Sequence, residues 1–325
     1  MKSSRIPESF YEEEMRDGYL VTAKRKRVWA CELDILLAFD EICRRHDIPY
    51  FLESGTLIGA VRHHGFIPWD DDIDIQMFRS DYERIKEICR AELEPPLYWQ
   101  DMYTILGEQT QFDDTVFRLL PFGKIRNADT AAIEEPRAPI SMNQGIYIDI
   151  FPLDDAFDDK GFTREMFELQ KEIYYATFAE NELKKVIATG EGHTVVPIND
   201  LQTIMNLPLI ERFKMLENMF IAYIGKSTMV NHKIEEILGW QKNLSKTLYA
   251  STVYFDFEGF ELPAPAGYDE ILTAWFGDYM TPVQFPSHSM TVFDPDRSYR
   301  DYYSEAGVYI GPKEKTRDGI DNGVS

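Results

Sequence analysis

The sequence predicts an α/β fold, a mixed sheet flanked by helices, and three observations support this prediction. Segments with apolar residues at steps of three and four alternate with short apolar runs that fit strands. Hydrophobic residues make up 44% of the 325 residues, which is enough for the core of one large domain. Proline and glycine punctuate the later part of the chain, so we expect an extended C-terminal wrap after an added helical region.

The first half of the chain alternates expected helices with expected strands. Residues 1–22 should form an irregular, charged lead-in. A helix, a strand, a short helix, a strand and a helix are then predicted at 24–45, 50–52, 57–62, 73–77 and 81–93. Pro49 ends the first helix, because the residue before a proline avoids the helical region.

The second half predicts strands first and helices afterwards. Strands are expected at 116–120, 123–126 and 145–151, with Pro152 closing the last of them. Helices are expected at 163–185, 208–223 and 268–276. Residues 186–206 contain Gly190, Gly192 and Pro197, so they should form a loop.

The net charge of −22 limits the partners of the protein. Lysine and arginine number 34 against 56 aspartates and glutamates, so the surface repels nucleic acid and anionic membranes. One dense basic run, residues 24–27, begins the first expected helix. We interpret it as a solvated helix face, with a weak peripheral contact to a membrane surface as the alternative.

The cysteines and the N-terminal segment favour a cytoplasmic protein. Cys31, Cys43 and Cys89 lack a C-x-x-C spacing, which argues against a disulfide framework and against a zinc site. The acidic N-terminal stretch has no apolar core of the kind that signal peptides carry, and we expect no transmembrane segment. A position at the inner face of the membrane stays open.

The most informative segment is the acidic run Asp70-Asp71-Asp72-Ile73-Asp74. Residues two apart in a strand share a face, so Asp72 and Asp74 should project together while Ile73 faces the core. Two carboxylates 4 Å apart repel by roughly 4 kcal/mol at an effective dielectric near 20, and a divalent cation such as Mg²⁺ offsets this repulsion. An acidic loop without a ligand is the alternative. At least one of Asp70 and Asp71 is expected to be merely exposed.

A third carboxylate, Asp149, interrupts the apolar run 146–151. Buried aspartates are rare unless they are paired or bind a metal, so Asp149 either ligates the metal or takes the proton of an attacking hydroxyl. An aspartate satisfied at a strand end is the structural alternative.

Several further residues are candidates for binding phosphate. Ser54, Gly55 and Thr56 form a small-residue turn between a strand and a helix, where backbone N–H groups can approach phosphate oxygens. Arg62 follows the short helix and can pair with a phosphate. Lys124 and Arg126 alternate on a strand and should point the same way. A plain turn, a surface salt bridge and a solvated strand face are the respective alternatives.

These segments resemble the LicD family. Residues 53–74, ESGTLIGAVRHHGFIPWDDDID, are similar to the family signature, and residues 145–154, GIYIDIFPLD, are similar to its second block. Residues 268–269 and 275–282 resemble its closing block. The similarity extends over about residues 24 to 290. Ser54 departs from the glycine of many members, and serine is an accepted variant of that turn.

The resemblance implies a nucleotidyltransferase-type fold and a metal-dependent transfer reaction. Phosphocholine, or the ribitol phosphate used by fukutin-related members, would pass from a CDP-alcohol to a hydroxyl of a glycan or lipid-linked glycan, releasing CMP. Mg²⁺ or Mn²⁺ would be held by Asp72 and Asp74, with Asp149 matching the later carboxylate of the family. We therefore expect a lead-in at 1–22, a catalytic domain at 23–290 and a tail at 291–325.

Other functions stay open at this point. A nucleotidyltransferase that uses a nucleoside triphosphate, a glycosyltransferase with an Asp-x-Asp site and a non-catalytic nucleotide sensor each fit an acidic pair. The donor alcohol is not determined. Tyr147, Trp69 and Trp275 can surround a quaternary ammonium group, although core packing is the simpler interpretation. No role follows for His63, His64 or His288.

Overall fold

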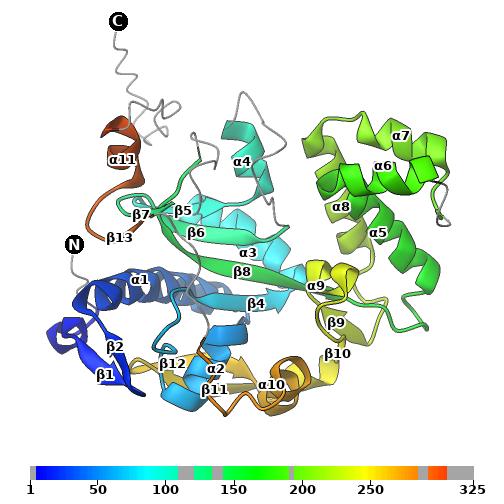
Figure 1. Cartoon of the computed structure of the whole chain (residues 1–325). Coiled ribbons are helices and arrows are strands. Elements are labelled where there is room, and N and C mark those ends of the chain that lie inside the picture. The colour runs from blue at the N-terminus through cyan, green and yellow to red at the C-terminus, as the bar shows by residue number, and fades with distance from the viewer. Residues whose placement is uncertain (1–4, 109–120, 134–141, 190–193, 285–291, 306–325) are drawn as a thin grey trace, which may run out of the picture.

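The computed structural model describes residues 5–108, 121–133, 142–189, 194–284 and 292–305, and a mixed sheet forms its centre (Figure 1). Within these residues the sheet has seven strands, in the order β10-β9-β8-β4-β3, with β6 beside β8 and β5 beside β6. Their bounds are β3 Phe51–Leu52, β4 Asp74–Phe78, β5 Leu97–Gln100, β6 Gly123–Asn127, β8 Ile146–Asp155, β9 Met229–Asn231 and β10 Leu244–Ser245. Strands β4 and β8 are parallel and the other pairs are antiparallel, so the predicted mixed sheet is confirmed.

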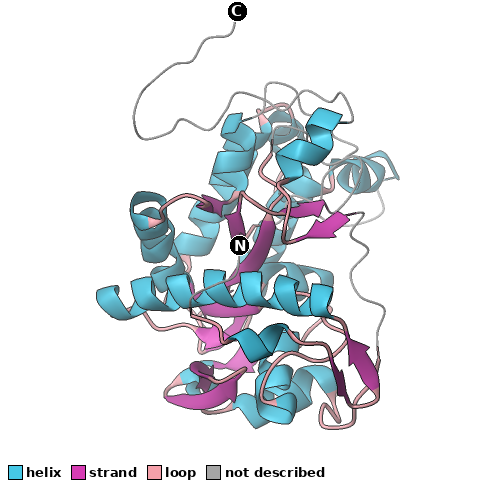
Figure 2. Ribbon diagram, turned by 90° about the vertical axis from the view of Figure 1, so that its left-hand side faces the viewer, coloured by secondary structure: helices cyan, strands magenta, loops and turns pink. Residues whose placement is uncertain are grey.

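Two long helices cover one face of this sheet (Figures 1 and 2). Helix α1 (Ala23–His46) packs on β8 and β6, and α3 (Arg79–Glu92) packs on β4 and β8. The Thr22 hydroxyl accepts a hydrogen bond from Arg25 N–H at the start of α1. Helix α1 ends at Asp47, which takes a left-handed conformation two residues before Pro49. Helix α3 starts after Phe78 without a side-chain cap, two residues before the start expected from sequence.

The opposite face is covered only in part. A cluster of apolar residues there includes Phe51, Leu153 and Tyr249, the last from the 3₁₀ helix η2 (Lys246–Tyr249). Helix α10 (Tyr268–Phe276), close to the range expected from sequence, adds Ile271 to the cluster. Helix α2 (Ser54–His63) contributes Leu57 and Ala60 to the same core cluster as α1, and helix α9 (Lys233–Leu238) follows His232, which stacks on Phe151 of β8.

A region of four helices lies beyond the C-terminal end of β8 (Figure 1). It contains α5 (Arg164–Phe178), α6 (Glu180–Thr189), α7 (Ile198–Met205) and α8 (Leu209–Ala222), and we call it the helical region. These helices share a hydrophobic core with Phe162 and Ile237, separate from the core under the sheet. The added helical region expected from sequence is thus present.

Two details of that expectation are wrong. The single helix over 163–185 is divided at Ala179, whose φ of −137° and ψ of 46° are not helical. Helix α7 occupies part of the stretch 186–206 that was expected to be a loop. Neither glycine nor proline marks the break, and Glu180 just after it pairs with Arg212 of α8, so packing between helices sets the division.

Strand β8 continues through Pro152 to Asp155, so the expectation that this proline closes the strand is also wrong. The Asp149 N–H donates to the carbonyl of Ile73, beside β4. Since N–H groups alternate between the two sides of a strand, the missing donor of Pro152 lies on the β6 side. Strand β6 has already ended there, because its last partner on β8 is Ile150, and no ladder bond is lost.

Two β-hairpins were not predicted from the sequence. The lead-in contains β1 (Glu14–Arg16) and β2 (Tyr19–Val21), joined by Asp17-Gly18 with φ values of 48° and 76°. Within the expected wrap, β11 (Thr252–Phe257) pairs with β12 (Phe260–Pro265) through Glu258-Gly259, with φ values of 54° and 88°. Positive φ at both central residues defines the two-residue turn that matches the twist of a hairpin.

The remaining described elements are short. They are η1 (Glu8–Tyr11), α4 (Met102–Glu108), β7 (Ala131–Ile133), β13 (Val292–Asp294) and α11 (Tyr299–Glu305). The strand expected at 116–120 lies outside the described residues. Among the helices that are described, none combines the length and the apolar composition needed to cross a membrane.

Candidate active site

Four charged side chains form a row across four neighbouring strands. Lys124 on β6 is the register partner of Asp149 on β8, and Asp149 is the register partner of Asp74 on β4. Glu53 follows β3, and its N–H donates to the carbonyl of Asp74 at 3.0 Å. Register partners project from the same face of a sheet, so we call these four residues the acidic row. Lys124 Nζ lies 2.7 Å from Asp149 Oδ1 at one end of it.

Burial raises the pKa values of two carboxyl groups of the acidic row, Asp74 and Glu53. The pKa of Asp74 lies well above its usual range because the carboxyl is desolvated and because Asp72 and Asp149 are negatively charged neighbours. Desolvation raises the pKa of Glu53 to about 8. Carboxyl groups perturbed in this way concentrate at functional sites.

The acidic run leads directly into this row. Strand β4 begins at Asp74, so Asp72 lies in the preceding loop and not in the strand as expected. The two side chains are nevertheless neighbours, because the charge of Asp72 is the second largest cause of the raised pKa of Asp74. Ile73 and Ile75 are fully buried in the core below, as predicted.

Asp70, Asp71 and Asp72 can hold a metal ion together. One carboxylate oxygen from each lies within 4.8 Å of the others. The expectation that Asp70 or Asp71 is merely exposed is wrong, since Asp71 is buried and Asp70 is half-buried. Carboxylate oxygens are the hard ligands that Mg²⁺ and Mn²⁺ prefer, so this donor set fits either ion.

The bend at Ser54 to Thr56 lies against the acidic run. It is the first turn of α2 and not a separate turn, with Ser54 at a φ of 41°. A Cβ atom added to Gly55 would lie 2.6 Å from Asp70 Oδ2, so a larger residue here would displace the carboxylate of Asp70. The Thr56 hydroxyl accepts a hydrogen bond of 2.9 Å from Asp74 N–H, which ties the bend to the start of β4.

Helix α1 supports the acidic run from below, which the sequence analysis did not predict. The Arg25 guanidinium donates to the carbonyl of Asp70 at 2.8 Å and lies 3.5 Å from Asp71 Oδ2. Trp29 Nε1 donates to the same carbonyl at 3.1 Å. The basic run 24–27 is therefore not a solvated face as interpreted, and Lys26 within it is buried and pairs with Glu14.

Glu32, one turn further along α1, is a second residue that the sequence analysis missed. Its side chain is 1% exposed, and Oε2 has no hydrogen-bond partner among the described residues. Desolvation, followed by the charges of Asp72 and Asp71, raises the pKa of this carboxyl well above its usual range. The sequence gives no sign of this role, because Glu32 lies on the apolar stripe of the helix, where a core residue is expected.

Lys124 and Arg126 point the same way, as predicted, and both cations lie over the ring of Tyr147. Arg126 is fully buried and donates to Gln100 Oε1 and to the carbonyl of Gly145. Lys124 reaches the acidic row, so of the two cations it is the one placed to meet a donor phosphate.

Arg62 lies apart from the acidic row. It is eight residues beyond Ser54, about 12 Å along α2, and its guanidinium donates to the carbonyl of Tyr279. Next to it, His63 Nε2 lies 3.0 Å from Asp17 Oδ2 in the β1–β2 hairpin. The structure therefore does not bring Arg62 together with the bend. His64 is the left-handed residue that ends α2, and His288 lies outside the described residues.

The three aromatic residues considered for a quaternary ammonium group contact different partners. Tyr147 lies beneath Lys124 and Arg126, Trp69 packs edge-on against His63, and Trp275 packs against His232.

Comparison with known proteins identifies the class of the domain that contains these residues. Residues 47–187 match the family model described as LicD/FKTN/FKRP, nucleotidyltransferase domain. These residues contain β3, the bend, β4, β6 and β8, and so every member of the acidic row. The fold is that of a nucleotidyltransferase domain, and the protein is a transferase.

Residues 47–187 therefore form a domain of the LicD/FKTN/FKRP family, and the chain is also similar to individual proteins. It is 29% identical over 254 residues to the lipopolysaccharide cholinephosphotransferase LicD of Haemophilus influenzae, covering 76% of this chain and 88% of that protein. It is 40% identical to human and mouse ribitol 5-phosphate transferase FKRP over only 45 residues, 14% of this chain and 9% of those proteins. An uncharacterized protein of Rickettsia prowazekii is 41% identical over 69 residues, 21% of this chain and 24% of that protein.

Proposed function

We propose that the protein transfers phosphocholine from CDP-choline to a hydroxyl of a cell-surface glycan and releases CMP. The observation that carries this proposal is the acidic row beside the Gly55 bend, in a chain that aligns with most of a lipopolysaccharide cholinephosphotransferase. The acceptor is a lipopolysaccharide, another cell-surface glycan such as a teichoic acid, or their lipid-linked precursor. The reaction takes place in the cytoplasm or at the inner face of the membrane.

The donor diphosphate would lie between the bend and the acidic row. Gly55 lets the backbone of α2 come close, and the first N–H groups of that helix can donate to phosphate oxygens. Lys124 supplies a positive charge at the other end of the row. Mg²⁺ or Mn²⁺, held by Asp72 and Asp74 with Asp149 or Asp70 in support, would neutralise charge on the diphosphate when bound.

The transfer step is a substitution at phosphorus. The acceptor hydroxyl forms a bond to the phosphorus that carries choline, and the bond from that phosphorus to the bridging oxygen breaks. CMP leaves with this oxygen. Asp149 accepts the proton of the acceptor hydroxyl, and its position between Asp74 and Lys124 supports that role. Positioning and charge neutralisation supply the catalysis, without a covalent intermediate on the protein.

The direct test is to incubate the purified chain with CDP-choline, Mg²⁺ and a lipopolysaccharide acceptor, and to measure CMP. We expect slow release of CMP without acceptor and faster release with it. Pyrophosphate release from a nucleoside triphosphate, with no CMP from any CDP-alcohol, would contradict the proposal and favour a nucleotidyltransferase.

A second donor is favoured by one specific observation. The 45 residues shared with FKRP, a ribitol 5-phosphate transferase, support CDP-ribitol as an alternative to CDP-choline. Parallel measurements with CDP-choline, CDP-ribitol and CDP-glycerol separate these donors by their kcat/KM values.

A further inference from the structure

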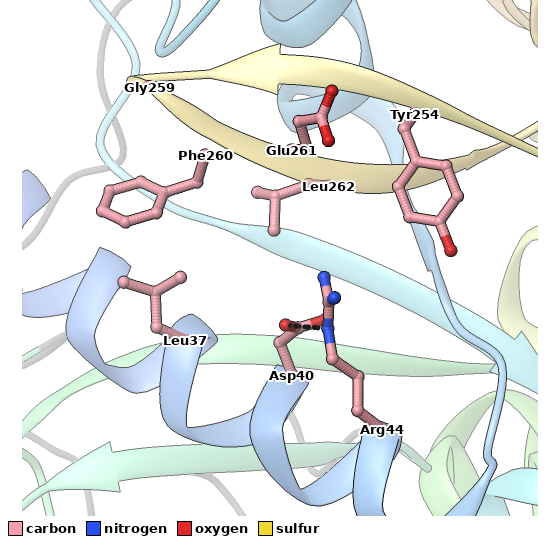
Figure 3. Close-up of a pocket in the computed structure, with 8 residues that line it drawn as sticks. All are labelled: Leu37, Asp40, Arg44, Tyr254, Gly259, Phe260, Glu261 and Leu262. Atoms are coloured by element: carbon pink, nitrogen blue, oxygen red, sulfur yellow. Dashed lines mark hydrogen bonds and ion pairs between the residues drawn. The ribbon is translucent and has the colours of Figure 1, made fainter.

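A recess lies between α1 and the β11–β12 hairpin, away from the acidic row (Figure 3). Its volume is about 450 Å³, within the range of small-molecule sites. Asp40 and Arg44 line it from α1, and they lie about 22 and 28 Å along the helix from Arg25, which holds the acidic run. The recess is thus a different site from the one that binds the donor.

One side of the recess carries the guanidinium of Arg44, whose side chain is 62% exposed. Arg44 Nε donates to Asp40 Oδ2 at 2.6 Å, and the other oxygen of Asp40 accepts from the Tyr50 hydroxyl at 3.0 Å. Figure 3 shows the guanidinium of Arg44 rising from α1 towards the hairpin. No described residue accepts from its two terminal amino groups, so they can donate to a ligand in the recess.

The walls of the recess are apolar and aromatic. Leu37 of α1 faces Phe260 and Leu262 of β12, and Tyr254 of β11 stands at the other side (Figure 3). Tyr254 is 59% exposed although it sits in a regular strand. An exposed aromatic ring beside anchored hydrogen-bond donors suits a ligand that has one apolar face and polar edges.

The charges at the recess argue against an anionic ligand. Asp40 neutralises Arg44, Glu261 adds a carboxylate at the rim, and the chain carries a net charge of −22. A phosphate or nucleotide would be repelled by Glu261 and by the net charge of the chain, and the neutralised Arg44 would attract it little. A neutral ring with many hydroxyl groups meets no such repulsion, and its hydroxyl oxygens accept from Arg44 while its apolar face packs on Tyr254 or Phe260.

We propose that this recess binds a neutral sugar ring, and that it holds a second part of the glycan acceptor away from the transfer site. The sugar-binding part stands on the recess alone. The link to the acceptor rests on the proposed function. A glycan is a chain of rings, so one molecule can occupy both the recess and the acidic row.

The first experiment measures sugar binding without any donor. Methyl glycosides of glucose, galactose and N-acetylglucosamine are titrated into the full chain and followed by saturation-transfer NMR. We expect at least one to bind in the millimolar range, Tyr254→Ala to weaken it about tenfold or more, and Arg44→Lys to weaken it by less. Trp240→Ala removes an aromatic residue that is 66% exposed and not part of the recess, and should change nothing.

Several outcomes would overturn the sugar site. They are a failure of all three glycosides to bind, an equal loss in Trp240→Ala and Tyr254→Ala, or competition by inorganic phosphate. None of them depends on CDP-choline turnover, so the sugar site and the proposed function fail separately.

The second experiment tests the link to the acceptor. Tyr254→Ala should raise the KM for a lipopolysaccharide acceptor several-fold and leave the acceptor-free release of CMP from CDP-choline unchanged. An unchanged KM for the acceptor in this variant, when glycoside binding is lost, would overturn the link.

Discussion

Two buried glutamates, one in each half of the molecule, have opposite surroundings. In the helical region, Glu172 of α5 accepts hydrogen bonds from the backbone N–H groups of Val195 and Val196 at 2.6 and 2.8 Å. In the acidic row, Glu53 is 2% exposed, and its Oε1 has no hydrogen-bond partner among the described residues. Both side chains are carboxyl groups that folding removes from water, which costs free energy unless it is offset.

The contrast between Glu172 and Glu53 distinguishes a structural carboxylate from one in a binding site. Glu172 joins α5 to the segment before α7, and its hydrogen bonds offset its desolvation. Glu53 adds to a group of carboxylates that already contains Asp74 and Asp149, with Lys124 as the cation in the row. Such an arrangement destabilises the fold by itself and is stabilised by a cation, so we interpret it as a binding site and the helical region as scaffold.

The largest expected effect is at the centre of the acidic row. Asp74→Asn should lower CMP release from CDP-choline roughly a thousandfold, because charge neutralisation in the transfer step depends on this carboxylate. Manganese affinity, measured by electron paramagnetic resonance, should fall with it. The free energy of unfolding should not fall, since a repelled carboxyl is removed. Activity within tenfold of the wild type would refute the role of Asp74.

The next effect tests whether α1 belongs to the site. Arg25→Gln should weaken manganese binding by about 10- to 100-fold, the usual range for groups that orient metal ligands, because the carbonyl of Asp70 and the carboxylate of Asp71 lose their anchor. Arg25→Lys should recover part of the loss.

The matched control for Arg25 is Arg27→Gln, which removes a surface pair with Asp296 and should leave the metal affinity unchanged. If both glutamine variants bind manganese equally well, Arg25 does not position the acidic run.

A substitution at Glu172 tests whether the helical region is only a scaffold. Glu172→Gln should lower the free energy of unfolding by about 1–3 kcal/mol in urea, because an amide group replaces an acceptor oxygen opposite two N–H donors. Manganese affinity and CMP release should stay at wild-type values. A change in metal affinity would show that the helical region is more than scaffold.

The last effect is the pH dependence of stability without metal. The pKa of Glu53 is about 8 in the folded chain against 4.5 for an ordinary glutamate, so the folded state holds a proton that the unfolded state has lost. The free energy of unfolding should therefore fall as pH rises from 4.5 to 8, by up to about 1.4 kcal/mol per unit for one group. Asp74 and Glu32, whose pKa values are also raised, act in the same direction.

Urea titrations in EDTA at several pH values measure this slope. Glu53→Gln removes one titrating group and should make the slope shallower, whereas Glu261→Gln, on an exposed strand face, should not. Identical slopes for the wild type and Glu53→Gln would contradict the assignment.

Much of the sheet and the centre of the site could be predicted because their signals are local. Alternation of side chains along a strand correctly separated Asp74 from Ile73 and Ile75, and the same rule placed Lys124 and Arg126 on one side of β6. The Asp17-Gly18 and Glu258-Gly259 turns were equally local signals of hairpins, and they were overlooked.

Other residues could not be assigned because their roles depend on partners far away in the chain. In the sequence Arg25 is one residue of a basic run, and only the fold brings it to the carbonyl of Asp70, 45 residues later. The sequence suggests Arg62 as a phosphate ligand, whereas in the structure it lies at the end of α2 and donates to the carbonyl of Tyr279. Glu32 has the spacing of a core residue, and only its neighbours in space make it part of the acidic site.

The order of residues along the chain by itself determined which acids stand on extended backbone and where a glycine precedes them, because those properties follow from alternation and turn chemistry over a few positions. Tertiary structure alone decided which of these acids meet, what holds them and which cations reach them. Strand register and helix packing join residues that are tens of positions apart, and no local pattern encodes the distance between them.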